Sequence, residues 1–157
     1  MTEGCIKTYI TIVGTISISE DGEGNIDGLY LPSFNLPILR DHESDAINEA
    51  YVQLNEYLAG KRKEFDLPLK YEGTEFQEKV WDALQNIPYG ELISYSGIAK
   101  VIGKENAYRA VGTACGSNPL PIFIPCHRVI GSDGSIDKYA GGAALKKKLI
   151  DIERDGS

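Results

Sequence analysis

Helix starts and stops follow one another closely between residues 74 and 116, and they limit this stretch to short helices. Thr74 and Gln77 have the spacing of a capping box, in which each side chain bonds the backbone of the other residue at a helix start. The sequence Ile87-Pro88-Tyr89-Gly90 ends that helix, because proline and glycine interrupt helical hydrogen bonding. The second half of the chain is therefore predicted to be helical.

Two further short helices are predicted after this stop. Ser94 can cap one that runs to Gly103, and Asn106 can cap another that ends near Cys115, with Gly116 as its stop signal. The tight turn between them gives the spacing of a helix-turn-helix, a motif that binds DNA. An ordinary helical hairpin has the same spacing, so this pattern alone leaves both interpretations open.

The first half has a different character. Residues 5–18 are rich in β-branched residues with partial alternation, which predicts one β-strand, and after a turn at 21–25 the chain can return as a strand over 26–31. Apolar residues at helical spacing predict a helix over 45–59, followed by a short strand or extended linker at 65–69. This half is predicted to be a small α+β unit.

The last third of the chain combines loops with one final helix. Residues 117–121 are a proline-containing loop, and a short apolar run at 122–124 stops at Pro125. Gly141-Gly142 precedes a helix predicted over 143–154. We therefore expect two domains, an N-terminal α+β domain over residues 1–69 and a C-terminal domain over residues 70–157.

The charge distribution indicates which half could meet a polyanion. The formal net charge of -7 argues against a nucleic-acid partner, because phosphate binding needs Lys and Arg. However, residues 1–73 carry six Lys and Arg against thirteen Asp and Glu, whereas residues 74–157 carry ten of each. Any nucleic acid should therefore meet the second half, and the electrostatic attraction there should be modest and local.

The chain has three cysteines, Cys5, Cys115 and Cys126, and their odd number without paired spacing makes a disulfide framework improbable. The N-terminus has no basic patch followed by an apolar run, and no apolar stretch approaches the roughly 18 residues of a membrane span. These features predict a soluble protein in a reducing, intracellular compartment.

Cys126 is followed directly by His127 and Arg128, a combination that suits nucleophilic chemistry. Thiolate is the reactive form of cysteine, and a free thiol has a pKa near about 8.5, so a nearby base must raise the thiolate fraction. If the segment is extended, neighbouring side chains point to opposite sides, and a bridging water is then the more plausible link between Cys126 and His127. A carboxylate should orient the imidazole, and either Glu153 or Asp151 could supply it. Purely structural roles for all three residues remain an alternative.

An ordered set of short motifs changes the balance between these interpretations. The stretch from Gly73 to Glu153 resembles the O6-alkylguanine-DNA alkyltransferase family, and it covers about half of the chain. The matching pieces are Gly73-Thr74-Glu75-Phe76-Gln77, Val80-Trp81, Ile87-Pro88-Tyr89-Gly90, Ser94-Tyr95, Arg109-Ala110-Val111-Gly112, Asn118-Pro119, Ile124-Pro125-Cys126-His127-Arg128-Val129, Ser132-Asp133-Gly134, Tyr139 and Gly141-Gly142. The first half resembles the family's N-terminal domain only loosely, through residues 65–69.

The resemblance implies a fold and an activity. The fold is α+β, with a small N-terminal α/β domain of the ribonuclease H-like type and a helical, winged-helix-like C-terminal domain that holds the helix-turn-helix. The activity is DNA repair by irreversible, single-turnover transfer of the alkyl group of O6-alkylguanine, and of O4-alkylthymine, to Cys126. No cofactor is expected. The expected partner of the monomeric protein is double-stranded DNA, in the cytoplasm at the nucleoid or in a eukaryotic nucleus.

The resemblance also assigns roles to individual residues. Cys126 accepts the alkyl group, His127 acts as base through water, and Glu153 orients His127. Asn118 ties the helix-turn-helix to the loop that carries the cysteine. Tyr95 helps to rotate the phosphate beside the target and donates a hydrogen bond to guanine N3.

DNA contact is expected in the minor groove, with the target nucleotide flipped out of the duplex. Arg109 matches the arginine that fills the vacated place in the base stack, which a planar guanidinium can do better than lysine. Small side chains let the helix enter a groove about 6 Å wide, although tight helix packing would favour small residues too. With Tyr95 and Arg109, the predicted DNA-binding residues are Ala107, Ala110, Gly112, Thr113 and Arg128.

The guanine pocket is expected to be lined by Pro121, Val129 and Tyr139. Backbone carbonyls near Cys126 and Val129 would read the exocyclic amine, and the backbone N–H near Ala140 would bond O6. Some relatives carry a structural zinc site built from several Cys and His in the first domain. Only Cys5 and His42 are present in this first half, so no metal site is expected.

Three other functions compete with this one. An alkyltransferase-like protein binds alkylated DNA but lacks the acceptor cysteine, and Cys126 argues against it. A helix-turn-helix regulator would use the Cys126-His127-Arg128 segment only structurally. A cysteine hydrolase would turn over repeatedly, and the sequence shows no clear oxyanion-hole motif.

Overall fold

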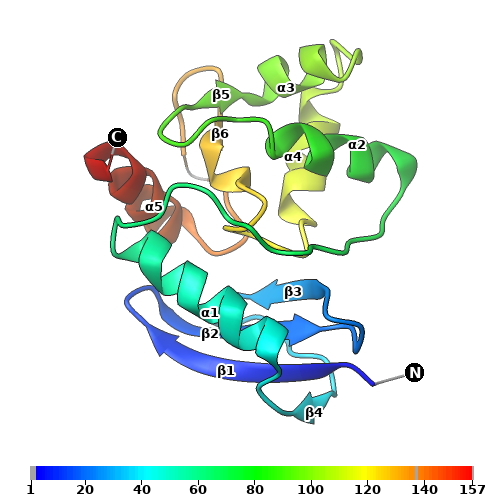
Figure 1. The fold of residues 1–157 in the computed structure, drawn as a ribbon. Coiled ribbons are helices and arrows are strands. Elements are labelled where there is room, and N and C mark those ends of the chain that lie inside the picture. Colours follow the sequence, from blue (N-terminus) through cyan, green and yellow to red (C-terminus); the bar gives the residue numbers. More distant parts are fainter. Residues whose placement is uncertain (1–2, 137, 157) are drawn as a thin grey trace. The chain divides into compact units, whose positions relative to one another are not determined.

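The computed structural model describes residues 3–136 and 138–156. The chain forms two compact units, Met1–Tyr71 and Glu72–Ser157. The first contains a sheet and one helix, and the second is mainly helical (Figure 1). This arrangement confirms the predicted α+β class, with a sheet domain followed by a helical domain.

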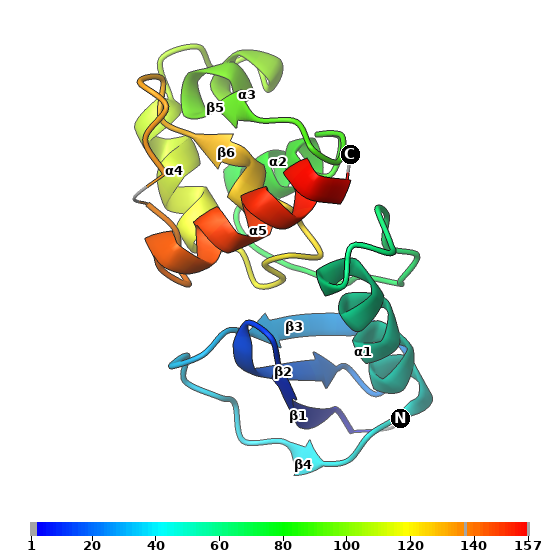
Figure 2. The same cartoon turned by 90° about the vertical axis from the view of Figure 1, so that its left-hand side faces the viewer.

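The first unit is built on a four-stranded sheet with the strand order β3-β2-β1-β4. Strands β1 (Cys5–Thr11) and β2 (Gly14–Glu20) form an antiparallel hairpin, and β3 (Ile26–Tyr30) pairs antiparallel with β2. The short β4 (Arg40–Asp41) pairs parallel with β1. Helix α1 (Asp45–Leu58) packs on one face of this sheet (Figure 2).

The prediction of a single strand over residues 5–18 is wrong, because the chain reverses after Thr11. The Thr11 hydroxyl donates to the carbonyl of Gly14 (2.8 Å) and accepts from the N–H of Val13 (3.1 Å), which closes the turn. Gly14 has a φ of 103°, a conformation that glycine adopts without strain. The β-branched residues on both sides of the turn concealed it in the sequence, and Gly14 was its only sign.

The second unit surrounds its core with short helices and one small parallel strand pair. The Thr74–Gln77 capping box is present, and it starts the first of these helices as predicted. Strands β5 and β6 were not predicted, because two residues are too few to show alternation. The elements are α2 (Glu75–Leu84), β5 (Ile93–Ser94), α3 (Tyr95–Val101), α4 (Tyr108–Gly116), the 3-10 turn η1 (Cys126–Arg128), β6 (Val129–Ile130) and α5 (Ala143–Gly156).

Helices α3 and α4 form the predicted pair joined by a tight turn, but α4 starts differently. Its N-cap residue is Ala107, with no side-chain hydrogen bond, so the expected cap by Asn106 is wrong. The turn is held by the backbone instead, since the N–H of Ala107 donates to the carbonyl of Lys104 (2.8 Å). On the inner side, the indole N–H of Trp81 donates to the carbonyl of Ala114 (2.8 Å), which fixes α4 against α2.

In the part of the chain that the structure describes, no helix combines the length and the apolar character that crossing a bilayer requires.

Replacing Thr74 with Ala should lower the free energy of unfolding by about 1 kcal/mol, because the N–H of Gln77 loses its acceptor at the start of α2. Urea denaturation followed by circular dichroism measures the change. Thr74→Ser keeps the hydroxyl and serves as the control. An equal loss in both variants would contradict the assignment of the effect to the cap.

Candidate active site

Cys126 lies in a tight 3-10 turn, not in the extended segment that the sequence analysis assumed. The N–H of Cys126 donates to the carbonyl of Ile124 (2.8 Å), and the N–H of Arg128 donates to the carbonyl of Pro125 (3.1 Å). The turn has no strand-like alternation, and all three of its side chains, including that of His127, are buried.

Asn118 connects the end of α4 to this segment. Its side-chain amide donates to the carbonyl of Ile124 (2.9 Å), and its side-chain oxygen accepts from the N–H of Leu120 (2.9 Å). Asn118 is itself buried, so both bonds are shielded from water. The structure thus brings Asn118 to the position that its predicted linking role requires.

The Cys126 thiol is 3% exposed, and burial raises its pKa to about 11. Hydrogen bonding to Asn118, the positive charge of Lys146 and hydrogen bonding to Tyr139 act in the opposite direction but do not cancel the effect. Burial therefore favours the protonated thiol in the free protein, which is opposite in direction to the raised thiolate fraction expected from the sequence.

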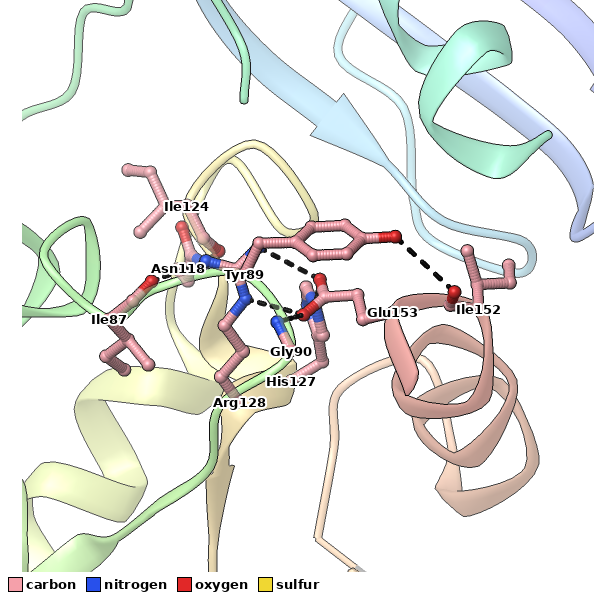
Figure 3. Close-up of polar contacts among 9 residues, drawn as sticks. All are labelled: Ile87, Tyr89, Gly90, Asn118, Ile124, His127, Arg128, Ile152 and Glu153. Carbon is pink, nitrogen blue, oxygen red and sulfur yellow. Dashed lines mark hydrogen bonds and ion pairs between the residues drawn. The ribbon is translucent and has the colours of Figure 1, made fainter. Parts of the chain in front are cut away.

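A buried charged cluster includes His127 and Arg128, the two residues that follow Cys126 (Figure 3). The Glu153 carboxylate lies 2.6 Å from Nε2 of His127, and it accepts from Nε (2.8 Å) and Nη2 (3.0 Å) of Arg128. The backbone N–H of Gly90 adds a fourth bond (3.0 Å). The sequence left open whether Glu153 or Asp151 orients the imidazole of His127. Glu153 contacts the imidazole, whereas Asp151 pairs with Lys147 (2.6 Å).

Burial favours the neutral form of the imidazole. Burial lowers the pKa of His127, while the adjacent Glu153 raises it and the positive charges of Arg128 and Lys146 lower it further. A neutral ring that donates from Nε2 to the carboxylate carries its basic lone pair on Nδ1. His127 can therefore accept a proton, and Glu153 would stabilise the imidazolium that results.

The prediction that Arg128 contacts DNA is wrong, because its side chain is committed to the interior. The residue is 7% exposed, and besides its two bonds to Glu153 it donates from Nη1 to the carbonyl of Ile87 (2.6 Å). Arg128 compensates the buried carboxylate and fixes the end of the segment that follows α2.

Lys146 is a site residue that the sequence analysis missed. It is 1% exposed, and its ammonium donates to the carbonyls of Val129 (2.6 Å) and Lys138 (3.0 Å) and lies 3.5 Å from the Tyr95 hydroxyl. Lys146 is the first of three consecutive lysines, and such a run in a sequence is typical of a solvent-exposed surface. The one available signal was helical spacing, because Lys146 shares a face of α5 with the buried Leu149, Ile150 and Glu153.

A cavity of about 100 Å³ has Cys126 among the residues that line it. Of the predicted pocket residues, Tyr139 and Ala140 line it, whereas Pro121 and Val129 are buried away from it. The Val129 carbonyl accepts from the Lys146 ammonium (2.6 Å), and its contact with the exocyclic amine of guanine stays a prediction. The lining residues are Tyr95, Gly112, Cys115, Gly116, Cys126, Lys138, Tyr139 and Ala140.

Of the residues predicted to bind DNA, Arg109, Ala110 and Thr113 lie on the outer side of α4, whereas Tyr95 begins α3 and lines the cavity together with Gly112. Arg109, Ala110 and Thr113 are exposed, Ala107 and Gly112 are partly exposed, and the opposite side of the helix is buried through Val111, Ala114 and Cys115. Their contacts with DNA stay a prediction. Among residues 3–136 and 138–156, no three His, Cys, Asp or Glu side chains form a group that could hold a metal ion.

Each of the two units is similar to a domain of a known protein family. Residues 75–155 match the family described as 6-O-methylguanine DNA methyltransferase, DNA binding domain, and residues 6–71 match its ribonuclease-like domain. The chain is 50% identical over 115 residues to the inducible methylated-DNA--protein-cysteine methyltransferase of Bacillus subtilis, a stretch that covers 73% of this chain and 64% of that protein.

Two other proteins are similar to this chain. A methylated-DNA--protein-cysteine methyltransferase of Methanosarcina barkeri is 54% identical over 107 residues, which cover 68% of each chain. The crystal structure of Mycobacterium tuberculosis OGT in complex with DNA superposes with a TM-score of 0.91 and 38% identity, and the match covers 98% of this chain and 94% of that one.

Replacing Arg128 with Met should lower the free energy of unfolding by about 3–5 kcal/mol, because Glu153 would keep its buried charge without the guanidinium. Urea denaturation measures the loss. Lys147→Met is the matched control, since it breaks an exposed lysine–carboxylate pair and should cost less than about 1 kcal/mol. Similar losses in the two variants would contradict the central role of the buried pair.

Alkylation of Cys126 by iodoacetamide should accelerate about tenfold per pH unit between about pH 7 and 10, because the thiolate fraction grows in that proportion below a pKa of about 11. Peptide mapping by mass spectrometry follows the reaction at this residue. A plateau above about pH 8.5, as in a free cysteine peptide, would contradict the raised pKa.

Proposed function

The chain belongs to the 6-O-methylguanine DNA methyltransferase family, and we propose that it repairs DNA by transferring the alkyl group of O6-alkylguanine to its own Cys126. One observation carries the assignment of the acceptor. Cys126 lines a cavity and is followed by a neutral imidazole that a buried carboxylate orients. The same site would accept the alkyl group of O4-alkylthymine.

The reaction is a displacement at the alkyl carbon. The thiol proton passes to Nδ1 of His127, through a water where the two groups do not meet directly. The sulfur then forms a bond to the alkyl carbon as the bond from that carbon to O6 breaks. Glu153 stabilises the imidazolium during this step, and the positive charge of Lys146 favours the developing thiolate.

The departing guanine leaves with a negative charge that needs a partner. Tyr95 lines the cavity, where its hydroxyl donates to the carbonyl of Lys138 (3.3 Å) and accepts from the Lys146 ammonium (3.5 Å), so a bound base would take the place of the Lys138 carbonyl as its acceptor. The backbone N–H at Ala140 is a second donor for O6. The thioether product has no activated leaving group, so each molecule reacts once.

Double-stranded DNA is the proposed partner, and α4 is the element that enters its minor groove. The target base must leave the duplex to reach a thiol that is 3% exposed. Arg109 would fill its place in the stack, supported by its exposed position on α4. We propose a monomer that needs no cofactor and works on chromosomal DNA, in the cytoplasm at the nucleoid or in a nucleus.

Incubation with a duplex that contains one O6-methylguanine should add one methyl group per molecule, and peptide mapping should place it on Cys126. Cys126→Ala should gain none while it still binds the duplex. Cys5→Ala, which removes a buried thiol of the other unit, should react like the parent protein.

Three outcomes would overturn this assignment. Methylation of Cys126→Ala would move the acceptor elsewhere, and repeated release of product from each molecule would indicate a hydrolase. DNA binding without methyl gain by the parent protein would favour a regulator or a purely recognising protein.

A further inference from the structure

Helix α4 has two functional sides. Its outer side carries the exposed Arg109, Ala110 and Thr113, whereas Gly112, Cys115 and Gly116 contribute to the cavity that Cys126 also lines. The proposed DNA-reading helix is therefore also one wall of the acceptor cavity. This second surface was not foreseen from the sequence, where small residues in α4 could be explained by groove entry alone.

Cys115 contributes to this wall as a small uncharged group. It is buried, and burial strongly raises the pKa of its thiol, with a further contribution from the adjacent Cys126. A thiol that stays protonated behaves as a small apolar side chain. Cys115 therefore limits the space near the acceptor without competing for the alkyl group.

Gly116 lines the same cavity and is itself exposed, so open space surrounds it. A methyl group added at Gly116 would meet no atom within 4 Å, whereas one added at Gly112 would touch the Tyr95 ring at 3.7 Å. The wall is thus closed by an aromatic ring at Gly112 and open at Gly116. Gly116 also needs no left-handed backbone conformation, so alanine fits there without strain.

The geometry of displacement directs the alkyl group toward such side walls. The attacking sulfur, the alkyl carbon and the departing oxygen lie nearly in line during transfer. Anything larger than methyl must therefore extend sideways from that line. The residues that such a group could meet in this cavity include Gly112, Cys115 and Gly116 of α4.

We propose that Cys115 and Gly116 determine how large an alkyl group Cys126 can accept, with the open position at Gly116 admitting groups bulkier than methyl. This inference rests on the proposed function, because it concerns the same transfer. Changing the size of either residue should alter the relative rates of large and small alkyl groups, while the transfer chemistry at Cys126 stays the same.

The test compares second-order rate constants for O6-methylguanine, O6-propylguanine and O6-benzylguanine placed in the same duplex. Gly116→Ala and Cys115→Leu should lower the benzyl-to-methyl rate ratio by about tenfold or more, the usual effect of a methyl-sized change in an apolar pocket. Cys115→Ala should raise the ratio, or extend the range of accepted groups if the parent protein accepts only methyl. Cys5→Ala is the matched control and should leave the ratio unchanged.

A ratio separates selectivity from general damage, because lost stability or weaker DNA binding lowers all three rates together. Parallel losses for the three groups, or ratios within about twofold of the parent in both Cys115 variants, would overturn the proposal even if Gly116→Ala fails to fold. Failure of the parent protein to accept any of the three groups would instead overturn the proposed function.

Discussion

The buried carboxylate of Glu153 is the constraint on which the second unit depends. A carboxylate that is 2% exposed is stable only when its charge is balanced and its oxygens are bonded. Arg128, His127 and the backbone at Gly90 meet that requirement, and they come from η1 and from the segment after α2. The arrangement that stabilises one charge therefore also joins α5 to the cysteine turn and gives the imidazole its orientation.

In this arrangement the Cys126 thiol and the His127 imidazole, between which a proton would pass, are both uncharged. The Cys126 thiol is held protonated by burial, and burial likewise keeps His127 neutral. Under the proposed single-turnover function such a resting state protects the thiol, because a permanent thiolate would be consumed by small electrophiles in solution. Transfer would then begin only when the alkylated base enters the cavity.

Much of this structure was predictable from local patterns. The capping box at Thr74, the paired short helices and the two-part division follow from short-range hydrogen bonding and helix-breaking residues. The ordered motifs also led to the prediction that Cys126 is the acceptor, and the family match over residues 75–155 includes that position.

The features that were missed all depend on contacts between distant parts of the chain. Arg128 and Lys146 have the composition of surface residues, and only the folded chain shows that one balances Glu153 and the other donates to Val129 and Lys138. The turn after Thr11 was concealed because both of its sides have strand-forming residues. Secondary-structure propensity is a property of single residues, whereas the burial of a charged side chain depends on hydrogen-bond partners that only the folded chain brings together.

The contact between Trp81 and Ala114 gives the molecule an intrinsic optical reporter. The chain has one tryptophan, and its indole N–H is bonded to the backbone of α4, the helix that forms part of the cavity wall. Indole emission depends on hydrogen bonding and local polarity. A small displacement of α4 would therefore change the fluorescence of the unlabelled protein, so its structural response to a bound ligand can be followed in real time without an attached dye.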